Sequence, residues 1–153
     1  MKFWVLAGVI ALSCGTATAA EYSIDFVAQH MAKRDHERGL PDDQQRVGAI
    51  AGMLSVAANQ CKRTNTEETA YMAVADKVMA ARNLLADKGV DVSMYDLLDV
   101  LRSTLADGKK NWDCASVLSA YVTLRQSDTT ITHIGAYKAV QSFRDVGVLG
   151  ATQ

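Results

Sequence analysis

Apolar residues recur at intervals of three and four along most of the chain after residue 20, which is the spacing of amphipathic α-helices. Strand-like alternation is scarce, and Pro41, the one proline, stands where it suits a first helical turn. The pattern predicts an all-α fold, a single compact domain of about five or six helices. The expected helices cover residues 24–38, 41–61, 66–88, 94–107, 112–124 and 130–146.

Each expected helix carries one apolar stripe that we expect to face a common core. The charged segment 33–38 is expected to lie in solvent. Gly48 and Gly52, four residues apart, are expected to let a neighbouring helix approach closely. The predicted core residues are Ile24, Val27, Ala28, Met31, Val47, Ile50, Leu54, Ala57, Cys61, Tyr71, Val74, Val78, Ala81, Leu85, Met94, Leu97, Leu98, Leu101, Leu105, Ala115, Leu118, Tyr121, Val122, Ile134, Tyr137, Val140 and Phe143.

Small polar residues and glycines mark the expected helix ends. Hydroxyl and amide side chains accept hydrogen bonds from the first free backbone N–H groups, and glycine tolerates the left-handed conformation that often ends a helix. The predicted N-caps are Ser23, Ser93 and Asn111, and the predicted stops are Gly39, Gly89 and Gly108.

The first 20 residues have the organisation of an export signal. Lys2 precedes an uncharged apolar run over residues 3–12, which is too short to cross a bilayer core about 30 Å thick. The small residues 13–20 follow, with cleavage sites after Ala19 and Ala20. We predict a cleaved signal peptide (1–20), a helical domain (21–146) and a flexible C-terminal tail (147–153), exported to the periplasm or the extracellular space.

Cys14 leaves a second processing route open. Ser13 precedes this cysteine as in a bacterial lipoprotein box, but Ala11 stands where such boxes usually have leucine. A lipid anchor at Cys14 is therefore the less favoured alternative to a free protein. No later apolar run approaches the length of a membrane span, so none is predicted.

Loss of residues 1–20 leaves two cysteines, Cys61 and Cys114. An even number of cysteines in an exported protein predicts one disulfide between them. Closing a loop of this size stabilises a protein by roughly 4 kcal/mol in the chain-entropy model. No C-x-x-C-H motif is present, which excludes covalently attached c-type haem.

Charge excludes one class of partner. Removing Lys2 leaves 15 of 16 Lys and Arg against 17 Asp and Glu, a net charge of −2. A nucleic-acid-binding domain normally carries a concentrated basic surface, so no nucleic-acid partner is expected.

The densest group of polar residues, 29–43, superficially resembles a metal site. His30 and His36 are six residues apart and diverge on a helix, and Lys33 and Arg34 flank them. We expect an exposed face whose charges pair with one another, with no metal ligand. His133 has no carboxylate among its helical neighbours and is expected to be structural. No cofactor and no catalytic residue is predicted.

The most specific local feature is residues 111–121, in which Trp112, Leu118 and Tyr121 are the candidate partner surface. An aromatic core beside the disulfide is the alternative. The Trp-x-Cys at Trp112 and Cys114, in a small exported helical chain, resembles the HdeA-type acid-stress chaperones of the bacterial periplasm. It differs from them because the tryptophan precedes the second cysteine here and the first one there.

These features favour a non-enzymatic binding or accessory protein, of inhibitor, immunity or secretion-accessory type, whose partner is another protein. The resemblance implies a periplasmic acid-stress chaperone as the alternative function. A metal carrier or a small enzyme is the third possibility.

Overall fold

The computed structural model describes residues 22–40, 44–63, 69–105, 108–109, 111–128 and 130–149. Throughout these segments the regular structure is helical, and the predicted all-α domain is confirmed. The helices are α1 (Ile24–His36), α2 (Gln44–Gln60), α3 (Ala70–Ala86), α4 (Met94–Thr104), α5 (Cys114–Ser127) and α6 (His133–Asp145).

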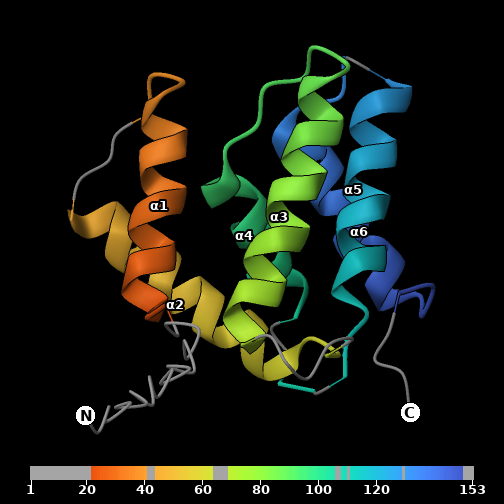
Figure 1. Ribbon diagram of the computed structural model, residues 1–153. Coiled ribbons are helices and arrows are strands. Elements are labelled where there is room, and N and C mark those ends of the chain that lie inside the picture. Colours follow the sequence, from red (N-terminus) through yellow and green to blue (C-terminus); the bar gives the residue numbers. More distant parts are fainter. Residues whose placement is uncertain are drawn as a thin grey trace, which may run out of the picture.

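Helix α4 lies at the centre of the domain. In Figure 1, α1, α3 and α5 stand side by side, α2 crosses at their lower end, and α4 lies behind α3. Helix α4 contacts each of the five other helices. Its buried residues are Met94, Leu97, Leu98, Val100, Leu101 and Thr104.

A buried helix needs partners for the backbone groups at its ends, and α4 obtains them from two other helices. The carboxylate of Asp35 on α1 accepts hydrogen bonds from the N–H groups of Met94 (2.9 Å) and Tyr95 (3.1 Å). At the other end, Arg144 on α6 donates to the carbonyl oxygens of Ser103 and Thr104, each at 3.2 Å. Both charges also have the sign that the helix dipole favours.

The burial of Asp35 corrects the expectation that segment 33–38 lies wholly in solvent. Asp35 is 0% exposed. It follows Ala28, Met31 and Ala32 at helical spacing, so it continues the buried face of α1. Its partners at the start of α4 lie 59 and 60 residues further along the chain, which a local pattern cannot reveal.

Most of the predicted helix ends agree with the structure. The side chains of Ser23 and Ser93 accept from backbone N–H groups as N-caps. The predicted cap Asn111 is wrong, because Asp113 accepts from the N–H of Ser116 and caps α5. The stops at Gly39, Gly89 and Gly108 have φ values of 83°, 72° and 71°, the left-handed region that favours glycine.

Several predicted packing faces are wrong. Ala115 is exposed and Ile134 is 61% exposed, because α5 and α6 turn other residues towards the core. Gly48 and Gly52 are also exposed, and a Cβ built on either would meet nothing within 4 Å. No described helix approaches these glycines, because α2 packs through its opposite face, which includes Ile50.

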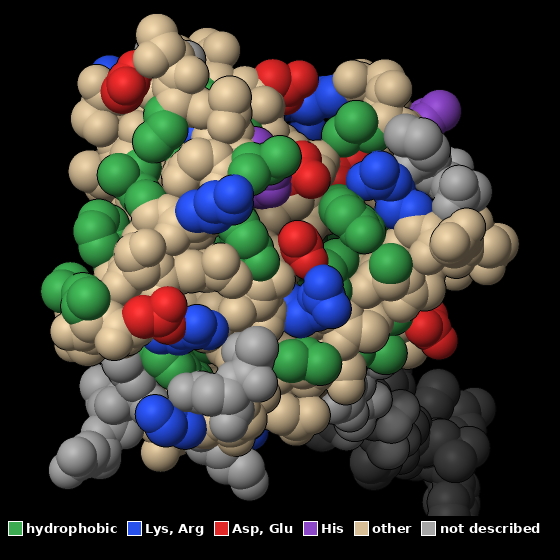
Figure 2. All heavy atoms as spheres, turned by 180° about the vertical axis from the view of Figure 1, so that it is seen from behind, with side chains coloured by type: hydrophobic (Ala, Val, Ile, Leu, Met, Phe, Trp, Pro, Cys, Tyr) green, Lys and Arg blue, Asp and Glu red, His purple; other side chains and the backbone are tan. Residues whose placement is uncertain are grey.

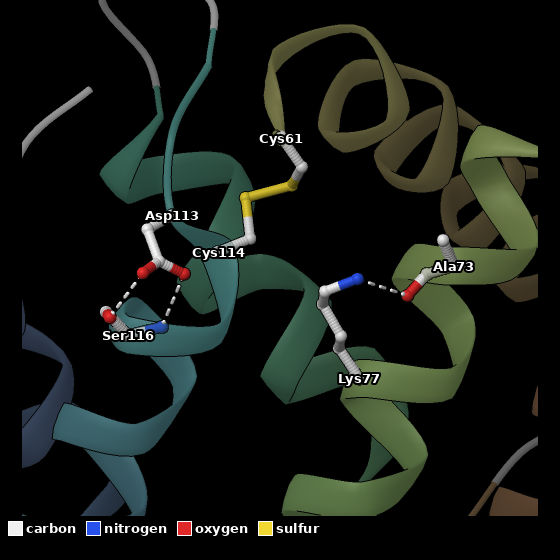
Figure 3. The surroundings of a disulfide bond; sticks show 6 residues. All are labelled: Cys61, Ala73, Lys77, Asp113, Cys114 and Ser116. Atoms are coloured by element: carbon white, nitrogen blue, oxygen red, sulfur yellow. Dashed lines mark hydrogen bonds between the residues drawn. A yellow bond between two sulfur atoms is a disulfide. The ribbon is translucent and has the colours of Figure 1, made fainter. Parts of the chain in front are cut away.

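Cys61 and Cys114 form the predicted disulfide between the end of α2 and the start of α5, with their Cα atoms 5.5 Å apart (Figure 3). Two backbone hydrogen bonds form beside it. The N–H of Lys62 donates to the carbonyl of Trp112 (2.7 Å), and the N–H of Trp112 donates to the carbonyl of Gln60 (2.9 Å). No helix in the described segments is long and apolar enough to cross a membrane.

Replacing Asp35 with Ala should lower the free energy of unfolding by on the order of 3 kcal/mol, because two buried N–H groups lose their acceptor. Urea denaturation followed by far-ultraviolet circular dichroism measures this change. Asp99→Ala is the control, since Asp99 also lies on a helix but bonds Arg102 at the surface. Equal losses in the two variants would contradict this role of Asp35.

Candidate functional site

The candidate partner surface predicted from the sequence is not a surface in the folded chain. Trp112 and Leu118 are each 2% exposed, and Tyr121 is 0% exposed. Trp112 lies beside the disulfide, and the other two belong to the inward face of α5. This prediction is therefore corrected, because the three side chains are part of the core.

Tyr121 and His133 join α5 to α6. The hydroxyl oxygen of Tyr121 lies 2.8 Å from His133 Nδ1, and Tyr137 stacks on the other side of the imidazole. Burial raises the pKa of Tyr121 to about 12, with Arg125 opposing the shift and Asp96 adding to it. His133 thus has a protonated phenol as its partner instead of an activating carboxylate, which suits a structural contact.

The two histidines of the predicted polar face have separate partners. Arg34 Nε donates to His30 Nε2 (3.2 Å), and the Nδ1–H group of His36 donates to the carbonyl of Leu40 (3.2 Å). Asp42 and Asp43, from the same sequence segment, lie outside the described residues. Within the described part of the chain, no group of three or more His, Cys, Asp or Glu side chains could hold a metal ion.

A cluster of charges that the sequence analysis missed surrounds the C-terminal end of α1. Arg82 on α3 is only 5% exposed, and its Nη2 donates to the carbonyl of Arg34 (3.0 Å). Arg38 forms an ion pair with Asp91 (2.6 Å). Burial lowers the pKa of Arg82, and Arg38 and Arg34 lower it further, against Asp35 and Asp91. No local signal in the sequence pointed to the contact of Arg82, because Arg34 lies 48 residues away along the chain.

An exposed aromatic pair at the start of α1 was also missed. Tyr22 and Phe26 stack with their ring centroids 4.7 Å apart, and they are 48% and 51% exposed. The hydroxyl of Tyr71 donates to the carbonyl of Tyr22 and so ties this end of α1 to α3. The signal in the sequence was two aromatic residues four positions apart, next to the predicted cap Ser23.

The rest of the visible surface is mixed in character. On the face that Figure 2 shows, hydrophobic side chains are interspersed with charged ones and do not gather into one broad patch. The other large apolar side chains that are exposed among the described residues are Val56, Leu84, Ile134, Val146 and Val148.

Comparisons with protein-family models, with curated proteins and with solved structures find no match for this chain. The function therefore has to be argued from the side chains themselves. Among the described residues, the Tyr22–Phe26 pair is an aromatic stack with both rings about half exposed, and it is the candidate site.

The raised pKa of Tyr121 predicts a loss of stability in alkali. The unfolded chain gives up this proton near pH 10 and the folded chain only near pH 12, so the free energy of unfolding falls between these values. The expected loss is on the order of 2 kcal/mol. Urea denaturation across this pH range should show a flatter profile for Tyr121→Phe. An unchanged slope in Tyr121→Phe would contradict the assignment.

Proposed function

We propose that this chain is a small exported, non-enzymatic binding or accessory protein that docks on another protein, of inhibitor, immunity or secretion-accessory type. The observation that carries the proposal is the half-exposed stack of Tyr22 and Phe26. Aromatic side chains are enriched at protein interfaces and contribute much of their binding energy.

The stack is held in place before any partner arrives. Tyr22, which precedes the N-cap Ser23, stacks on Phe26 in the first turn of α1, and the hydrogen bond from Tyr71 fixes the backbone of Tyr22. Side chains that are already ordered lose little conformational entropy on binding. A fixed aromatic pair therefore suits an anchor that enters an apolar pocket of a partner.

The position of the stack agrees with the proposed export. Tyr22 comes directly after the predicted cleavage region, so removal of residues 1–20 would leave the stack close to the new N-terminus. This end of the mature chain could then approach a partner without a preceding segment in the way. The free protein, in the periplasm or outside the cell, is the form proposed to bind.

A photo-reactive amino acid at position 26, in protein expressed in its native compartment, should crosslink to one protein partner. The same residue at position 134, also apolar and exposed but on α6, is the matched control. With the partner identified, Phe26→Ala should weaken its binding at least about tenfold, whereas Ile134→Ala should not.

Equal partner affinity for wild type and Phe26→Ala would contradict docking through the stack. The intact mass of the exported protein, measured in the same experiment, shows where the signal peptide is cleaved. A chain that begins at a diacylated Cys14 would replace the free protein with a membrane-anchored one.

A periplasmic acid-stress chaperone is the second candidate, and the buried carboxylate of Asp35 favours it. Its oxygens accept the first N–H groups of the central helix α4, so loss of this contact would loosen the centre of the fold.

The chaperone function would require client aggregation to be suppressed only in acid, with binding of an apolar dye and a fluorescence change of Trp112. This residue is the one tryptophan after residue 20, so its emission reports directly on the core. A metal carrier or a small enzyme would be supported by stoichiometric metal in protein purified from its native compartment.

A further inference from the structure

The two cysteines of the disulfide differ in their exposure to solvent. Cys61 follows the last residue of α2 and is partly exposed, whereas Cys114 is the first residue of α5, belongs to the core and is only 2% exposed. Exchange of a disulfide begins when a thiolate attacks one of its two sulfur atoms, and access is one of the factors that decide which sulfur is attacked. A thiol in solution therefore reaches this bond from the side of Cys61.

Attack on Cys61 makes Cys114 the leaving group, and the position of Cys114 on α5 suits that role. Burial among apolar side chains disfavours a thiolate, but the N-terminal end of a helix favours one. The carboxylate of the N-cap, Asp113, accepts hydrogen bonds from the N–H group (3.1 Å) and the hydroxyl (2.7 Å) of Ser116. Figure 3 shows that this carboxylate points towards Ser116 and away from the disulfide.

A lysine on α3 adds a positive charge to the surroundings of the disulfide. Figure 3 shows Lys77 there, with its Nζ donating to the carbonyl oxygen of Ala73 (3.1 Å). This hydrogen bond holds the ammonium group in place. Cationic side chains favour the thiolate form of a nearby cysteine, so Lys77 favours the release of a thiolate when the disulfide is opened.

We propose that Cys61 is the site at which this protein exchanges its disulfide with an external thiolate, from a thiol–disulfide oxidoreductase or from a small thiol. The thiolate attacks Cys61 Sγ and forms a new disulfide with it, and the electron pair of the broken S–S bond leaves on Cys114 Sγ. In the reverse reaction the Cys114 thiolate attacks Cys61 Sγ and expels the external thiolate. No oxidant is consumed in either direction, because one disulfide replaces another. This site is separate from the Tyr22–Phe26 stack and does not depend on the function proposed for it.

A small neutral thiol, 2-mercaptoethanol, tests the direction of attack on the full mature chain in its folded, oxidised form. The exchange is stopped with acid, and peptide mapping locates the adduct. Cys61 should carry the adduct at least about tenfold more often than Cys114, because the fold restricts access to Cys114. The control is the same reaction in concentrated urea, where both sulfurs are accessible and the two adducts should form within about twofold of each other. Equal adducts in the folded chain, or an excess on Cys114, would overturn the proposal.

Two single-cysteine variants, expressed in the native compartment, identify the source of the thiolate. Cys114→Ala keeps Cys61 and should be captured as a mixed disulfide, whereas Cys61→Ala keeps the buried Cys114 and should be captured at least about tenfold less. Non-reducing electrophoresis and intact mass separate the sources, because an oxidoreductase adds a whole protein and a small thiol adds only a small mass. Circular dichroism shows whether each variant folds, and the wild-type reaction decides if one does not. Capture of neither folded variant, or equal capture of both, would overturn the proposal.

Discussion

The contact between the Asp35 carboxylate and the first N–H groups of α4 is the constraint on which the rest of the structure depends. Helix α4 touches all five other helices, and its first residue, Met94, is fully buried. A buried helix end without partners lowers the free energy of unfolding, because several backbone groups then lack hydrogen bonds. Asp35 from α1 and Arg144 from α6 solve this problem, and in doing so they fix where the outer helices lie.

Helix ends serve as counter-charges throughout this domain. Asp35 faces the positive end of α4, Arg144 the negative end of α4, and Arg82 the negative end of α1. Buried side-chain charges are thus matched mainly with backbone dipoles instead of with one another.

Local sequence patterns predicted the fold class and most of the core residues, but they did not predict the candidate sites. Ile50, Leu54 and Leu98 repeat at helical spacing, and the parity of the cysteines led to the Cys61–Cys114 pair. These signals arise within one helix or from a simple count. The role of Asp35 depends on a helix 59 residues away, which no local pattern contains.

The same limit explains the error at Trp112, Leu118 and Tyr121. Leu118 and Tyr121 share the inward face of α5, as their spacing indicated, and Trp112 lies just before this helix. Whether such a face meets solvent or other helices depends on how many neighbours cover it. The burial of a helix face is determined by the packing of the whole domain. The apolar stripe could therefore be located from the sequence, but its exposure to solvent could not.

The hydrogen bonds between Gln60, Lys62 and Trp112 have a consequence for the order of events during folding. They hold the end of α2 against the start of α5 through the backbone alone, without any use of sulfur. A reduced chain that has folded therefore presents its two thiols to an oxidant already side by side. Oxidation then stabilises a conformation that has already formed. The fold itself determines that Cys61 pairs with Cys114. This bond can therefore form late in folding and still give a single product.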